Sequence, residues 1–144
     1  METVVWIDEA EAGCCGPTFA TSDVITWHLA PEDGWAPDGL HELDPELGEV
    51  AWRLSLHEDP APPEQRGRVR RIQALEREVD PDPQVPWPAP LRSRRRGGYA
   101  PAPELSSYLV DVPQVHRDDE PSLAGRRIVG WLVDLDLFPV APRA

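Results

Sequence analysis

The sequence predicts a mainly β protein, a small six-stranded barrel or a curled antiparallel sheet with long proline-rich loops. Three observations support this fold class: apolar and polar residues alternate in several short segments, turn residues separate those segments, and little of the chain has a clear helical period. We expect a single β domain over residues 1–144, because this length is usual for one domain and can bury a sizeable core.

Three strands are expected in the first half of the chain, at residues 3–8, 23–29 and 49–57. The first is rich in β-branched and aromatic residues, which favour strands. In the second, one face collects large apolar side chains. The third has the clearest alternation, with apolar side chains at every second position: Val50, Trp52, Leu54 and Leu56.

The fourth segment, residues 67–79, has two interpretations. Its apolar residues recur at helical spacing, which favours a helix. A bulge at residues 70–71 would instead bring Val69, Ile72 and Ala74 onto one face of a strand. We predict the bulged strand, because the segments before and after it are strands.

Two more strands are expected at residues 105–112 and 127–137. Gly130, beside Trp131 in the last strand, is expected to mark either a bend or a close approach of the backbone. Four tryptophans lie in predicted strands and are expected in the core: Trp6, Trp27, Trp52 and Trp131.

Long loops separate these strands. The loop at residues 30–48 is rich in proline and glycine, and residues 80–104 form a Pro/Arg-rich loop insertion with seven prolines. Loops of this length are uncommon in compact domains and usually have a function or are disordered.

The charge of the chain is unevenly distributed. The net charge is −12, but residues 1–64 carry −14 and residues 65–144 carry +2. An acidic half repels nucleic acid and anionic membranes, and it favours either simple solubility or a protein partner with a basic surface. The chain begins without a secretory signal and has no apolar run long enough to cross a membrane, so a cytoplasmic location is expected. All basic residues apart from histidine are arginine, which indicates a GC-rich, bacterial genome.

Three stretches together resemble a known family. They are the Cys-Cys-Gly-x-x-Phe turn at residues 14–19, Gly-Arg-Val-Arg-Arg-Ile at residues 67–72, and Gly-Trp-Leu-Val-Asp-Leu at residues 130–135. With them, most of the chain outside residues 80–104 is similar to short uncharacterised bacterial proteins that share a domain of unknown function. The resemblance implies a single intracellular domain, and it implies no activity and no catalytic residue.

The adjacent Cys14 and Cys15 are weak candidates for chemistry, with His28 as their partner. Adjacent cysteines rarely bind one zinc ion, and no histidine lies at a ligand spacing. A reactive thiolate needs a nearby cation, whereas Glu9 and Glu11 precede this turn. We therefore expect one buried and one surface cysteine, no bound metal and no cofactor.

Asp134 and Asp136 project from the same face of a predicted strand, an arrangement that could bind a divalent cation or perform acid–base chemistry. The favoured interpretation is a solvent-facing pair, and His57 is expected to be exposed in the same way. No residue is assigned a catalytic role, so we do not expect an enzyme.

Six loop residues are the candidate binding residues: Trp35, Trp87, Arg94, Arg95, Arg96 and Tyr99. Tryptophans in proline-rich loops can anchor a partner, or they can fold back over a barrel end. Residues 92–96 form an arginine-rich element that could contact phosphate, although the acidic balance of the domain argues against nucleic acid.

The leading hypothesis is therefore a non-enzymatic binding or regulatory module, a monomer or weak dimer that presents an acidic surface and long loops to a protein partner. The first alternative is a small metal-dependent or cysteine-dependent enzyme. The second is phosphate or nucleic-acid contact through the arginine-rich loop.

Overall fold

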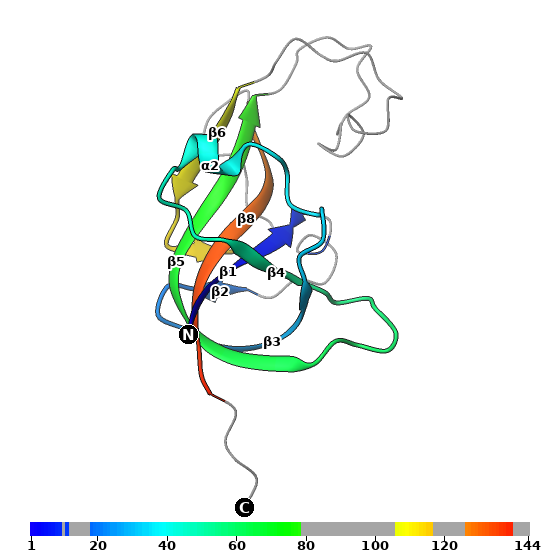
Figure 1. Ribbon diagram of the computed structural model, residues 1–144. Helices are drawn as coiled ribbons and strands as arrows, with labels where there is room; N and C mark the ends of the chain where they lie inside the picture. The colour runs from blue at the N-terminus through cyan, green and yellow to red at the C-terminus, as the bar shows by residue number, and fades with distance from the viewer. Residues whose placement is uncertain (10, 12–17, 79–105, 117–125, 140–144) are drawn as a thin grey trace, which may run out of the picture.

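The computed structural model describes residues 1–9, 11, 18–78, 106–116 and 126–139 (Figure 1). These residues form a mainly β structure with very little helix, which confirms the predicted fold class. The elements are β1 (Glu2–Asp8), β2 (Phe19–Ala20), β3 (Val24–Pro31), α2 (Leu40–Leu43), β4 (Val50–Leu54), β5 (Glu64–Glu78), β6 (Ser107–Asp111), β7 (Gln114–Val115) and β8 (Arg126–Leu137).

The six predicted strands correspond to β1, β3, β4, β5, β6 and β8, and they form one sheet in the order β3-β4-β1-β8-β5-β6. The ambiguous fourth segment is a strand, as predicted. Its pairing with β8 shifts register between Val69 and Arg71, so the predicted bulge is present and Val69, Ile72 and Ala74 all lie in the core.

Five of these strands close into a barrel, and β6 adds to the outside of the closure. The long strand β5 pairs first with β3 and then with β8, which joins the two ends of the curled sheet. Gly67 lies where these pairings overlap, opposite both Ile25 and Leu137. A Cβ atom there would be 2.7 Å from the carbonyl oxygen of Asp136, so the close crossing requires glycine.

One pairing differs from an antiparallel sheet. β1 and β4 are parallel neighbours, whereas all other pairings between strands are antiparallel. A parallel pair needs a long connection, and the chain between β1 and β4 contains β2, β3 and α2. The predicted small barrel or curled antiparallel sheet is in detail a closed five-stranded barrel with one added strand and one parallel pair.

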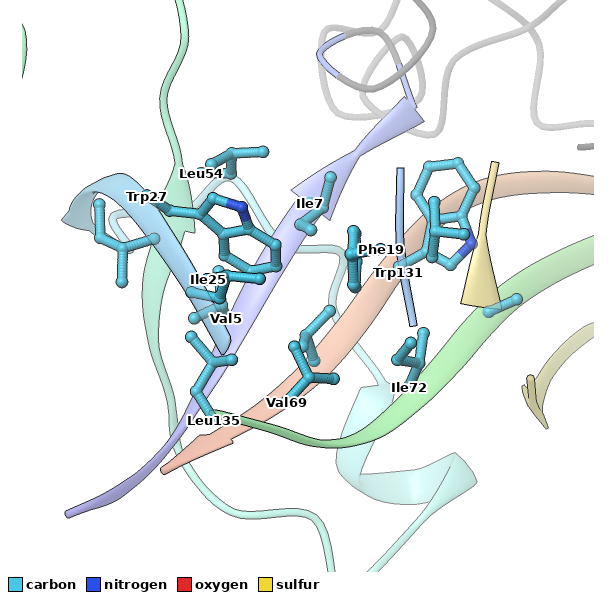
Figure 2. Packing of buried hydrophobic residues seen from close by; sticks show 14 residues of the cluster. Val5, Ile7, Phe19, Ile25, Trp27, Leu54, Val69, Ile72, Trp131 and Leu135 are labelled. Atoms are coloured by element: carbon cyan, nitrogen blue, oxygen red, sulfur yellow. The ribbon is translucent and has the colours of Figure 1, made fainter. Parts of the chain in front are cut away.

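The main core fills the inside of the barrel (Figure 2). In β1, β3 and β8 alternate residues point into this core, as the alternation predicted. The short β2–β7 pair adds Phe19 and Val115 to this core, and the Phe19 ring packs edge-on against Trp27 at 4.8 Å. Trp27 and Trp131 are buried here as expected, while Trp52 is only partly buried.

A second cluster lies on the opposite face of the sheet. Its buried members are Val4, Trp6, Leu40, Leu47, Leu75 and Leu132. Trp6 is therefore buried outside the main core, under the segment that connects β3 to β4. Its ring lies directly against Gly130, and a Cβ atom there would also lie 2.7 Å from the Ile7 carbonyl oxygen, which is the close backbone approach predicted at that glycine.

Candidate functional site

The connection between β3 and β4 is rich in acidic residues. We call residues 32–49 the acidic segment, because they contain seven carboxylates and no arginine. The segment lies over the outer face of the barrel, and its helix α2 contacts β6 (Figure 1). Leu40 and Leu47 are buried beneath it in the second cluster, so they fix the segment to the sheet.

Local hydrogen bonds shape the start of the acidic segment. The backbone N–H of Glu32 donates to the carbonyl of Ala51 on β4 at 2.9 Å. The Glu32 carboxylate accepts hydrogen bonds from the backbone N–H groups of Trp35 and of Ala36, the latter at 2.7 Å. Because this carboxylate organises the turn before α2, the loop has a defined conformation.

Two large apolar side chains are exposed among these carboxylates. Trp35, one of the predicted binding residues, is 40% exposed, and Leu43 at the end of α2 is 41% exposed. The guanidinium of Arg53 lies 4.6 Å from the centre of the Trp35 ring and pairs with Glu58. The structure thus places Trp35 at the surface, against β4.

Arg71 joins the acidic segment to the sheet. Its Nε donates to the Asp111 carboxylate on β6 at 2.7 Å, and its guanidinium lies 3.7 Å from the Asp44 carboxylate that follows α2. The hydrogen bond to Asp111 raises the pKa of Arg71. One arginine therefore connects β5, β6 and the end of α2.

The predicted pair Asp134 and Asp136 has two separate environments. Burial raises the pKa of Asp134, and the nearby Arg71 partly opposes this effect. Asp136 instead lies 3.2 Å from the amino group of Met1. Among the residues that the structure describes, no group of three or more histidine, cysteine or acidic side chains is arranged to hold a metal ion.

Sequence reasoning missed a charged cluster at the end of the sheet. Glu76 is only 1% exposed and lies 3.7 Å from Arg126, whose guanidinium stacks over the Tyr108 ring at 3.6 Å. The Tyr108 hydroxyl donates to Glu78 at 2.8 Å. The sequence did contain a signal for the burial of Glu76. The period of two along β5 places Glu76 on the same face of the strand as the buried Ala74. The buried Glu76 carboxylate has the oppositely charged Arg126 beside it, and we assign the cluster a structural role.

The other candidate residues divide into two groups. The Nδ1 atom of His28 lies 2.7 Å from the carbonyl of Pro62, and its Nε2 lies 3.4 Å from Glu64, so the ring connects β3 to the start of β5. His57 is exposed, as expected, near Glu11. Seven candidates lie outside the described residues: Cys14, Cys15, Trp87, Arg94, Arg95, Arg96 and Tyr99.

Within the described part of the chain, no helix has the length and hydrophobicity of a membrane span. Comparison with known proteins finds no match among curated proteins and none among solved structures. A family model described as "Family of unknown function (DUF6578)" matches residues 1–137, which is nearly the whole chain. The chain therefore belongs to this family of unknown function.

Proposed function

We propose that this protein is a non-enzymatic binding module whose acidic segment binds a basic region of a partner protein. The observation that carries the proposal is the combination of seven carboxylates with the exposed side chains of Trp35 and Leu43 on one ordered segment. Charge of one sign attracts and orients an oppositely charged partner, and aromatic side chains commonly supply the largest share of binding energy.

The way the segment is held favours binding over simple solubility. Leu40 and Leu47 attach it to the barrel, and Arg71 ties its Asp44 to β5. A segment that is already ordered loses less conformational entropy when a partner binds. Carboxylates that served only solubility would not require such anchoring.

The enzymatic alternative has less support in the described residues. Asp134, Asp136 and His28 each interact with a neighbouring element of the fold, and they do not converge on one site. The nucleic-acid alternative depends on residues 92–96, which lie outside the described residues and stay a prediction.

A defined cationic peptide tests the proposal. The probe is a fluorescein-labelled twelve-residue peptide that alternates arginine and valine, with binding followed by fluorescence anisotropy. We expect binding that weakens as salt is added, because screening weakens attraction between exposed charges. The Glu42→Arg/Glu46→Arg variant, which reverses two exposed charges of the acidic segment, is expected to bind about tenfold more weakly.

The matched control is Asp59→Arg/Glu64→Arg, which makes the same change of charge at two exposed residues in and after the β4–β5 connection. We expect this control to bind within about threefold of the unmodified protein. Equal losses in both variants would show that only net charge matters, and would contradict a site on the acidic segment.

A further inference from the structure

The strand β6 has one hydrogen-bonding edge that no other described strand covers. The backbone N–H of Glu78 donates to the carbonyl of Ser106, and that of Val112 donates to the carbonyl of Ile72, both at 3.0 Å. In an antiparallel ladder the residues that bond to the neighbouring strand alternate, so residues 108 and 110 also face β5. The backbone groups of Ser107, Leu109 and Asp111 therefore point away from the sheet.

The other strands of the large sheet do not offer such an edge. β3, β4, β1, β8 and β5 each pair with two or more neighbours because the barrel closes, whereas among the described strands β6 pairs with β5 alone. Natural edge strands are usually protected by proline, by a bulge or by inward-pointing charge. Residues 107–111 contain no proline, and their pairing with β5 shows no bulge, so two of these protections are absent from the described edge.

Exposed carboxylates lie beside this edge, together with Arg71, which pairs with Asp44 and Asp111, and Arg126, which pairs with Glu76. Asp111 lies on β6 itself with its side chain 66% exposed, and α2 with its exposed Glu42 contacts the strand. A second copy of this chain would bring a net charge of −12 and a second Asp111 to the same edge, which like-charge repulsion disfavours. A segment that carries arginine or lysine has the complementary charge.

We propose that an extended, basic segment of the partner protein adds to β6 as a further strand, with its cationic side chains beside the acidic segment. The backbone of Ser107, Leu109 and Asp111 supplies hydrogen bonds, and the neighbouring carboxylates supply selectivity for basic side chains. This inference rests on the proposed function and specifies the conformation of the ligand.

The test changes the backbone hydrogen bonds while the charges stay constant. Ser107→Pro removes an outward-pointing N–H and leaves the N–H groups that face β5 in place, and Ser107→Ala is the matched control that retains this N–H. We expect the arginine–valine peptide to bind Ser107→Pro about tenfold more weakly than Ser107→Ala. Urea unfolding of both variants verifies that they are folded.

A second arm uses the unmodified protein, so it does not depend on the folding of a variant. The same peptide with N-methyl groups on alternate residues keeps its charge but loses the donors along one edge. Placing these groups on either alternate set gives two peptides, and we expect at least one to bind about tenfold more weakly.

Equal binding by all three peptides, or equal binding to the proline and alanine variants, would overturn strand addition. If the Glu42→Arg/Glu46→Arg variant still lost affinity in that case, the proposed function would stand without it. A loss of affinity on N-methylation that was insensitive to the acidic residues would instead overturn the preference for a basic ligand. A stable dimer in light scattering that forms through β6 would show that a second copy occupies the edge.

Discussion

Gly130→Ala tests the packing that places the acidic segment on the barrel. A Cβ atom at residue 130 would lie 2.2 Å and 2.5 Å from two ring carbons of Trp6, and 2.7 Å from the carbonyl oxygen of Ile7. Neither a buried indole nor a strand carbonyl can move away without disturbing its own packing. Overpacking of this kind costs about 1–3 kcal/mol, and we expect a loss near 3 kcal/mol because both neighbours are rigid.

Urea unfolding followed by circular dichroism measures this loss. A change of about 3 kcal/mol corresponds to a midpoint lower by roughly 1.5 M urea and a melting temperature lower by about 9 °C. Gly48→Ala is the control, since a Cβ atom there would meet only the Val4 side chain at 3.4 Å. We expect the control to change stability by less than about 0.5 kcal/mol.

A double-mutant cycle with Trp6→Leu identifies the cause of the destabilisation. Replacing the indole gives the new methyl group space, so Gly130→Ala should cost at least about 1 kcal/mol less in the Trp6→Leu background. The contact with the Ile7 carbonyl remains, and rescue is therefore partial. A Gly130→Ala protein as stable as the unmodified one would refute the close packing of Trp6 on β8. It would also refute the second cluster, which holds the acidic segment on the sheet.

Two further variants examine the acidic segment and its surroundings. Leu40→Ala removes a buried anchor of the acidic segment and should lower the free energy of unfolding by about 2–3 kcal/mol. Amide hydrogen exchange should become faster in residues 32–49 and change less in β1. Unchanged exchange in residues 32–49 would contradict the anchoring. Burial raises the pKa of Asp134 above 3.8, so the folded state binds this proton more tightly than the unfolded chain does. The free energy of unfolding therefore falls as the pH rises from 3.8 through the raised pKa of the folded state. Asp134→Asn should therefore gain stability relative to the unmodified protein as pH is raised from 3 to 7 in urea unfolding, and a constant difference across this range would argue against burial as the cause.

The strands could be predicted because their signal is local. Alternating burial depends on one strand and one core, and this is why the six strands and the inward position of Val69, Ile72 and Ala74 followed from the sequence. The bulge was also predictable, since only an extra residue places Val69 and Ile72 on one face of a strand.

The closure of the barrel and the position of the acidic segment were not predictable in this way. Which strands pair depends on contacts between distant parts of the chain, so the parallel β1–β4 pair had no local signal. The second cluster had a weak local signal. Four consecutive residues of β1, from Val4 to Ile7, are apolar and buried, which requires cover on both faces of that strand. The edge of β6 that no described strand covers follows from the whole sheet order, and therefore only the structure locates it.

The most direct test of the binding account is an amide ¹H–¹⁵N spectrum of the full chain titrated with the arginine–valine peptide. If a basic strand adds to β6, the largest shifts fall in residues 106–112 and 32–49, and the amide protons of Ser107, Leu109 and Asp111 become protected from exchange on binding. Shifts concentrated on the β4–β5 connection, or binding with no protection of these three amides, would contradict it.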